Sequence, residues 1–169
     1  MIDPIHHRFV DAQRHMAADF AAANPDLCDI LALPDSKFLV HFRCPVLVRR
    51  SNGDPELADG CDVGISFGPD YCRRVDPGFV SVLSPAVFHP NILAHHPILA
   101  GMVCLGRSAP ATGISDILCM TYELLIWHSF SSNDCLNPEA AQWVRNHPDR
   151  VPLESCRVVR IPKREGITH

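Results

Sequence analysis

The chain has 169 residues, of which 47% are hydrophobic and 20% are charged, and its formal net charge is −4. This composition is typical of a folded, soluble protein, and the length favours one domain. The negative charge argues against a general nucleic-acid-binding protein, and no apolar run approaches the roughly 18 residues that a membrane span needs. The N-terminus does not resemble a signal peptide, so we expect a cytoplasmic protein without a membrane or nucleic-acid partner.

Eight cysteines and ten histidines raise the question of disulfides or a metal site. Successive cysteines are at least eleven residues apart, which excludes the paired spacing of zinc ribbons and redox dithiols. An even number of cysteines could form four disulfides, but without an export signal we expect reduced thiols. Two adjacent histidine pairs occur, but neighbours in sequence seldom point at one ion. No metal site is predicted.

Apolar residues at every third or fourth position predict a first helix that begins at Asp3 and ends at Asn24, each followed by proline. Aspartate is a good N-cap, and proline suits the first turn of a helix. The opposite face is polar, and its Arg8 and Arg14 have the ordinary interpretation of solvated side chains. The predicted apolar face consists of Ile5, Phe9, Ala12, Met16 and Phe20.

Four short apolar runs predict strands in the next part of the chain. The third run alternates apolar and polar residues, as a strand with one buried face does. Turn signals rich in Gly, Pro, Asn and Asp separate the runs. Short strands joined by tight turns are typical of an antiparallel meander. The runs occupy residues 28–33, 38–48, 61–67 and 79–83, and Pro45 interrupts the second of them.

Residues 114–128 carry the strongest helical pattern and predict a central, buried helix. After a polar loop, Asn137 and Pro138 predict the start of another helix, which ends before Pro148. The remaining stretch, 151–169, is basic, and its pattern leaves both an additional strand and an irregular tail open.

The candidate reactive centre consists of the tripeptide His89-Pro90-Asn91 and of Cys104, thirteen residues after the asparagine. Proline fixes its own φ and favours an extended residue before it, so the tripeptide holds a carboxamide in a stiff turn. A thiol nucleophile near a rigid amide donor is what acyl transfer requires. Taken alone, a cysteine is more often a small buried hydrophobe.

The order of helix, antiparallel meander, His-Pro-Asn turn, cysteine, helix and proline-started helix resembles the ubiquitin-conjugating enzymes. This resemblance implies an α+β, UBC-like fold with an N-terminal helix, a four-stranded antiparallel meander, an active-site cysteine loop, a central helix and a further C-terminal helix. It implies one domain over residues 1–169, with a core at about 3–148 and a basic extension at 151–169. The matching segments are residues 88–91, 101–105, 114–125 and 133–141.

In this family a cysteine accepts the C-terminal carboxyl group of ubiquitin, or of a ubiquitin-like protein, as a thioester from an activating enzyme. It then passes the acyl group to an amine, usually a target lysine. The resemblance makes Cys104 that cysteine, and Asn91 would brace the loop or stabilise the oxyanion. Asp134 stands where the family often has an acid that orients or helps deprotonate the lysine, and His89 is a further candidate catalytic residue. No cofactor is expected, since the partner activating enzyme uses the ATP.

The resemblance also assigns the first helix as the docking surface for the activating enzyme, which gives Arg8 and Arg14 a functional interpretation. Residues 94–98 look like an insertion into the active-site loop. Its His95 and His96 would either tune the thiolate and accept a proton or be ordinary exposed loop residues. Such departures resemble the divergent bacterial members of the family, which are encoded beside their own ubiquitin-like protein and often serve antiviral defence.

Two alternatives remain at this stage. The first is a non-catalytic relative of the same fold that binds ubiquitin-like proteins, although such relatives usually lack the cysteine. The second is a cysteine hydrolase that pairs Cys104 with His89. The second is less favoured because no residue in the sequence is identified that would orient the base.

Overall fold

The computed structural model describes residues 3–51, 53–106, 108–131, 133, 135–153 and 159–161. Within this part of the chain, one long helix is followed by strands, then by two helices and a short 3₁₀ turn. The predicted α+β class, with an N-terminal helix and a four-stranded antiparallel sheet, is confirmed. The elements are α1 (Pro4–Ala23), β1 (Cys28–Leu33), β2 (Lys37–Phe42), β3 (Val46–Val48), β4 (Glu56–Ala58), β5 (Cys61–Ser66), β6 (Val80–Ser84), α2 (Ile114–Leu125), α3 (Pro138–Asn146) and η1 (Pro148–Arg150).

The main sheet is an antiparallel meander with strand order β1-β2-β5-β6. The apolar run at residues 38–48, which Pro45 interrupts, is divided between two strands that belong to different sheets. Pro45 has no backbone N–H to give to a ladder, and the chain leaves the sheet after β2. Residues 46–48 become β3, which pairs with β4 in a separate two-stranded sheet. The sequence pattern did not predict β4, because two of its three residues are exposed and the third is only half-buried.

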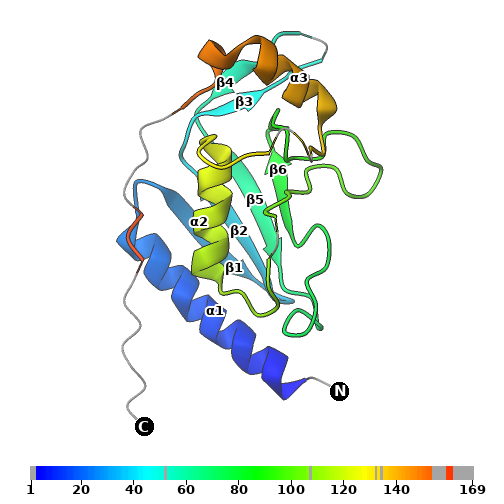
Figure 1. Cartoon of the computed structure of the whole chain (residues 1–169). Coiled ribbons are helices and arrows are strands. Elements are labelled where there is room, and N and C mark those ends of the chain that lie inside the picture. Colours follow the sequence, from blue (N-terminus) through cyan, green and yellow to red (C-terminus); the bar gives the residue numbers. More distant parts are fainter. Residues whose placement is uncertain are drawn as a thin grey trace.

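Helix α2 covers one face of the main sheet, and α1 crosses near one end of it (Figure 1). The alternation predicted for β5 is confirmed, since Cys61, Val63 and Ile65 are buried while the residues between them are half-buried. Their partners across β2 are also buried, so both strands present one apolar face to α2. Burying one such side chain contributes about 1.5–3 kcal/mol, and this layer therefore holds the sheet and helix together.

The buried face of α1 differs from the predicted one. Ile5 is 64% exposed, whereas Gln13, a polar residue, is 4% exposed. The Gln13 side-chain oxygen accepts a hydrogen bond from the Ile114 backbone nitrogen at 2.8 Å. Gly113, the N-cap of α2, has no side chain to do so, and Gln13 caps that helix from a distance. The buried residues of α1 are Val10, Gln13, Ala17 and Phe20.

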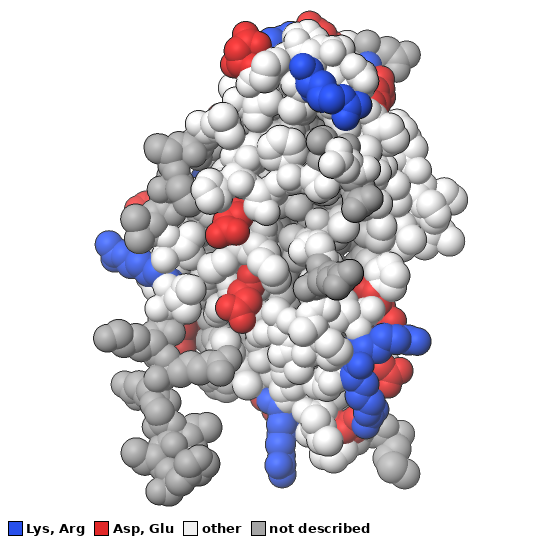
Figure 2. All heavy atoms as spheres, in the orientation of Figure 1, with Lys and Arg blue, Asp and Glu red and all other residues white. Residues whose placement is uncertain are grey.

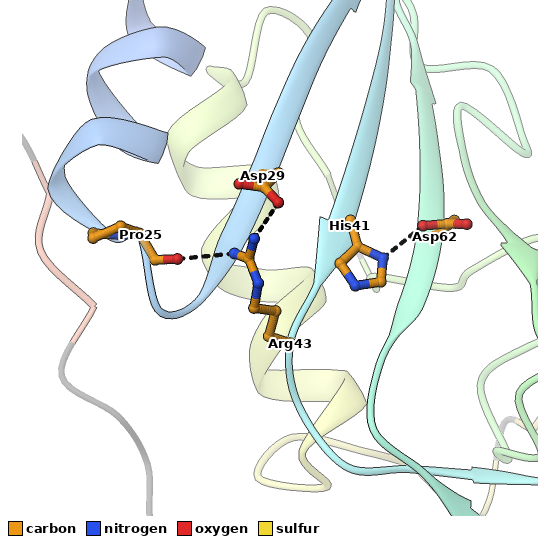
Figure 3. Close-up of polar contacts among 5 residues, drawn as sticks. All are labelled: Pro25, Asp29, His41, Arg43 and Asp62. Carbon is orange, nitrogen blue, oxygen red and sulfur yellow. Dashed lines mark hydrogen bonds and ion pairs between the residues drawn. The ribbon is translucent and has the colours of Figure 1, made fainter.

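The other face of the main sheet carries polar side chains that interact across the strands (Figure 3). Arg43 contacts the Asp29 carboxylate and donates a hydrogen bond to the Pro25 carbonyl at 2.8 Å. His41 of β2 lies 2.7 Å from Asp62 of β5. Because these side chains are substantially exposed, their pairing contributes little to stability.

The end of the chain is described only in part. Asn24, the C-cap of α1, accepts a hydrogen bond from the Arg160 nitrogen at 2.7 Å and donates one to its carbonyl at 2.8 Å. The predicted extension therefore packs against the end of α1 at residues 159–161, which have no regular secondary structure. Residues 154–158 and 162–169 lie outside the described residues. None of the helices within the described ranges has the length and hydropathy needed to cross a bilayer.

Candidate active site around Cys104

The tripeptide His89-Pro90-Asn91 forms a fully buried turn. The Asn91 backbone nitrogen donates a hydrogen bond to His89 Nδ1 at 3.1 Å, and the Ile92 nitrogen donates to the His89 carbonyl at 3.2 Å. A neutral imidazole whose Nδ1 accepts must carry its proton on Nε2, so this contact fixes the tautomer. Proline in the middle restricts φ, and the turn is rigid for both reasons.

The oxygens of this turn bind two other segments of the chain. The Asn91 carbonyl accepts a hydrogen bond from the Cys104 nitrogen at 2.9 Å. The Pro90 carbonyl accepts two, from Leu136 at 2.8 Å and Asn137 at 2.9 Å, just before α3 begins. The Asn91 side-chain oxygen accepts a fourth from the Ser131 nitrogen at 3.0 Å. The turn therefore fixes both the backbone of Cys104 and the loop after α2.

Residues 101–103 hold Cys104 from the other side. The Gly101 carbonyl accepts from the Val82 nitrogen at 2.8 Å, and the Val103 nitrogen donates to the Val80 carbonyl at 3.0 Å, so this stretch pairs with β6. Gly101 has a φ of +86°, and a Cβ there would lie 2.1 Å from the Val82 carbonyl oxygen. Only glycine fits at this point, where the backbone must approach β6 closely.

His89 is positioned by aromatic rings. Its ring centroid lies 4.2 Å from that of Trp127 and 6.3 Å from that of Phe130. Burial lowers the pKa of His89 to about 3, and the nearby Leu124 carbonyl offsets part of this effect. The contact is not a full hydrogen bond, since His89 Nε2 has no hydrogen-bond partner among the described residues. The ring is therefore neutral at physiological pH, and its one lone pair is occupied by the Asn91 N–H. No lone pair is left for proton abstraction from a thiol.

Helix α2 ends at Leu125, earlier than the predicted residue 128, because Trp127 has a φ of +64°. The nitrogens of His128 and Ser129 both donate to the Glu123 carbonyl, at 2.9 and 3.1 Å. This is a Schellman-type helix end, in which glycine is usual at the left-handed position. Here the packing of the Trp127 ring on His89 holds that conformation. The chain then turns back and brings residues 129–131 beside Cys104.

Two clefts meet at Cys104, whose side chain is half-buried. The first, which we call the α2 cleft, has a volume of about 430 Å³ and is lined by Asn91, Cys104, Leu105, Gly106, Met120, Glu123, Leu124, Ser129, Phe130 and Ser131. The second, which we call the β6 cleft, has a volume of about 380 Å³ and is lined mainly by residues 75–79 and 102–106. Among the described residues, the two clefts share Cys104, Leu105 and Gly106. The side chain of Cys104 therefore borders both clefts.

Several other thiols are poor nucleophiles. Burial raises the pKa of Cys28 and of Cys119 to about 11. Burial also raises the pKa of Cys61 far above its usual range and, to a smaller extent, that of Cys72. A thiol must lose its proton to attack a carbonyl carbon, so burial makes these four cysteines weaker nucleophiles than ordinary thiols.

The remaining predicted site residues lie in different places. Asp134 is outside the described residues. Arg8 is exposed on α1, but Arg14 donates a hydrogen bond to the Leu33 carbonyl at 2.9 Å and has a structural contact. His95 lines a separate cavity of about 260 Å³ near Arg49, and His96 Nδ1 accepts hydrogen bonds from Ile98 and Leu99 in its own loop. Neither histidine lines the two clefts at Cys104.

Sequence reasoning missed Glu123 and Ser131. Glu123 follows Met120 by three residues, so both lie on one face of α2. The helical pattern contains no sign that this face reaches Cys104. Ser131 acts through its backbone nitrogen, which carries no sequence signal at all. Within the described ranges, no group of three or more His, Cys, Asp or Glu side chains is placed to hold a metal ion.

Comparisons with known proteins give a limited result. No protein-family model matches the chain, and no curated protein matches it. Among solved structures, S. cerevisiae Ubc12 is similar at 21% identity, over 80% of this chain and 78% of that chain, with a TM-score of 0.45. Values of this size do not establish membership of a family.

Proposed function

We propose that this protein is a ubiquitin-conjugating-type enzyme that carries a ubiquitin-like protein as a thioester on Cys104 and transfers it to a lysine of a target. The observation that carries the proposal is the hydrogen bond from the Cys104 nitrogen to the carbonyl of Asn91 in a buried His-Pro-Asn turn. Thirteen residues separate the two in sequence, and this contact supports a common role for Cys104 and Asn91 in acyl transfer.

The chemistry requires little beyond this geometry. The Cys104 thiolate attacks the thioester carbonyl of the charged activating enzyme, a new C–S bond forms, and the enzyme's own thiol leaves. Exchange between two thioesters needs no strong general base, which agrees with a His89 that has no free lone pair. The activating enzyme spends the ATP, so the proposal involves no cofactor of this chain.

Asn91 would serve both as a brace and as an oxyanion donor. Its Oδ1 is engaged by Ser131, and its Nδ2 donates to no atom of the described residues. An amide donor held in position by its own oxygen can stabilise the negative charge of a tetrahedral intermediate without reorganisation. By resemblance, Asp134 would orient the incoming lysine and α1 would dock the activating enzyme, with Arg8 better available than Arg14.

A charging assay tests the proposal. The protein is incubated with ATP and a panel of activating enzymes, each with its ubiquitin-like protein, and the products are separated on a non-reducing gel. We expect an adduct that a thiol reagent removes. Cys104→Ser should give an ester adduct that resists the reagent, and Cys104→Ala should give none. Cys135→Ser is the matched control, because Cys135 is also a half-buried free thiol in the same region of the chain.

Each alternative has its own outcome. Charging of Cys104→Ala would show that another cysteine is the acceptor and would contradict the proposal. Binding of a ubiquitin-like protein without an adduct would favour a non-catalytic relative. Rapid loss of the acyl group to water, without amine, would favour a hydrolase.

A further inference from the structure

We infer that this chain is protected against becoming its own acceptor, because neither described cleft at Cys104 contains a lysine and because arginine takes the place of lysine elsewhere. A thioester on Cys104 is then transferred only to an amine of another molecule. The inference rests on the proposed function and adds to it a determinant of acceptor specificity. It begins from the sequence, in which no lysine occurs between residues 38 and 162.

Lysine is rare in the whole sequence. Of the 15 Lys and Arg residues, all but Lys37 and Lys163 are arginine. Lysine is normally among the commonest residues of soluble proteins. Arginine also supplies the cation of the ion pairs at Asp29, Asp76 and Glu139. The chain therefore carries positive charge on its surface but contains few primary amines.

A lysine amine and an arginine guanidinium group differ in their ability to attack a thioester. At the ordinary lysine pKa of about 10.4, roughly one amine in 2,500 is neutral at pH 7, and the neutral form is nucleophilic. The guanidinium group stays protonated up to about pH 12 and has no free lone pair. Arginine can therefore form ion pairs near a thioester without accepting the acyl group.

An amine on the chain itself would compete strongly with an external target. Groups joined by a short flexible segment meet at an effective concentration on the order of millimolar. At equal reactivity, such an amine would be acylated about 1,000 times faster than a target lysine present at about 1 μM. The positions of lysines on the chain therefore decide whether the acyl group reaches a target.

Self-transfer would also consume the enzyme. A neutral lysine amine would attack the thioester carbonyl, a C–N bond would form, and the C–S bond would break. Cys104 would leave as a thiolate and take up the proton that the nitrogen loses. The products would be a free thiol and an isopeptide bond on the chain. A lack of amines within reach of Cys104 therefore preserves both the acyl group and the enzyme.

The two clefts at Cys104 are lined by neither lysine nor arginine in the part of the chain that the structure describes. Figure 2 shows acidic but no basic side chains in the area over α2, and Lys and Arg lie toward the edges of this face. Asp76 lines the β6 cleft, and its partner at 3.0 Å is the exposed Arg74. Even at the border of this cleft, the cation is one that cannot accept an acyl group.

Of the two lysines, Lys37 lies far from Cys104 in the sheet. Residues 101–103 pair with β6, so β5 and β6 separate them from Lys37 at the start of β2. Neighbouring strands lie about 4.8 Å apart, so three such steps place residues 101–103 about 14 Å from β2 across the sheet. Phe38 is buried toward α2, and the exposed Lys37 side chain therefore leaves the sheet on the opposite face. Lys163 lies outside the described residues.

The test adds one amine at a time to the full chain. Ser129 is exposed and lines the α2 cleft with Cys104, so Ser129→Lys introduces an amine beside the thiol. Met120→Lys does so from the helix side of the same cleft. Ser129→Arg is the matched control, because it adds the same charge without a nucleophilic amine. Ser84→Lys adds the same amine at the exposed end of β6, outside both clefts.

Cys104 of each variant is acylated by exchange with a short glycine-peptide benzyl thioester at pH 8. A reducing agent then removes the thioester, and mass spectrometry of the peptides locates the acyl groups that remain on lysine. We expect none on the wild type or on Ser129→Arg. Residue 129 of Ser129→Lys should be acylated about 100-fold faster than residue 84 of Ser84→Lys, at a rate independent of protein concentration. Adding Cys104→Ala to Ser129→Lys should abolish this acylation, because the transfer starts from the thioester.

Two results would overturn the inference. The first is acylation of Lys37 or Lys163 in the wild type at a rate comparable to that of residue 129 in Ser129→Lys. The second is absence of self-transfer in both Ser129→Lys and Met120→Lys. In either case Cys104 still takes up the acyl group, so the result differs from failure of the proposed function. Absence of any acyl exchange at wild-type Cys104 would reject both.

Discussion

Two stretches of chain precede Cys104, and they differ in how deeply they are buried. Every residue from 88 to 92 is buried, whereas every residue from 94 to 98 is exposed. Asn91 is thirteen residues from Cys104 and bonded to its backbone, while His95 is closer in sequence and lines another cavity. Closeness along the chain therefore says less about a role at the thiol than the hydrogen bonds of the backbone do.

The largest effect is expected where the backbone itself fixes Cys104. Gly101→Ala would place a Cβ against the Val82 carbonyl at a positive φ, and we expect a loss of about 3 kcal/mol in the free energy of unfolding. Gly106→Ala is the matched control, since its φ is also positive but nothing lies within 4 Å of the new Cβ. We expect a loss of about 1 kcal/mol there. Urea denaturation measures both, and equal losses would contradict the close approach at Gly101.

The next effect separates the two roles of Asn91. We expect Asn91→Ala to slow transfer from Cys104 to amines about 100-fold, since one oxyanion donor is lost. It should also lower stability, because the Ser131 nitrogen loses its acceptor. Asn91→Asp keeps an acceptor for Ser131 but has no N–H, so it should be as slow as Asn91→Ala and more stable. Single-turnover discharge and thermal melts decide this, and a fast Asn91→Asp would exclude the donor role.

A smaller effect follows from burial of His89 in its neutral form. The unfolded chain protonates this residue below pH 6.5, whereas in the folded protein its pKa is lowered to about 3. Protons therefore favour the unfolded state as pH falls through this window, and stability is lost on acidification. Between pH 6.5 and pH 5 the loss attributable to His89 is about 2 kcal/mol. His89→Gln should lose less stability than the wild type over this range, and parallel pH curves would contradict a neutral buried ring.

The smallest effect is expected in the exposed stretch. His95→Gln/His96→Gln should leave the pH profile of thioester discharge unchanged, because neither histidine lines a cleft at Cys104 and His96 is occupied by its own loop. Discharge rates from pH 5.5 to 8 measure this. A break near pH 6.5 that disappears in the double variant would assign these histidines a role in proton transfer.

Local signals allowed much of the fold to be predicted. Asp3 accepts a hydrogen bond from the Ile5 nitrogen and begins α1, and the Asn137 side chain does the same for α3. Alternation predicted the buried face of β5. Each of these features depends on neighbours within a few residues. β4 was missed because it pairs with β3, which only residues 43–45 separate from β2, and such pairing is not visible in three exposed or half-buried residues.

The site could be predicted in part. The turn and the cysteine have recognisable residue types, and their spacing suggested a common centre. Gln13 and Glu123 could not be found in this way. Gln13 caps a helix that begins about a hundred residues away, and Glu123 lines the same cleft as Cys104, about twenty residues away. Neither contact is visible in the local sequence. The end of α2 was misplaced because Trp127 adopts a conformation that glycine normally takes, and its ring is held there by packing on His89 and Phe130.

The hydrogen bonds that the turn at 89–91 accepts also couple the local unfolding of the segments it holds. The amide hydrogens of Cys104, Leu136 and Asn137 are all hydrogen-bonded to the carbonyl oxygen of Pro90 or Asn91. None of them can exchange with solvent unless this turn or its partner segment opens. In hydrogen–deuterium exchange these amides should behave as one cooperative group, slower than the exposed loop at 94–98. When the turn opens, all three amides lose their acceptors in one event, and a binding partner that holds the turn closed slows exchange at residue 104 and at residues 136–137 alike.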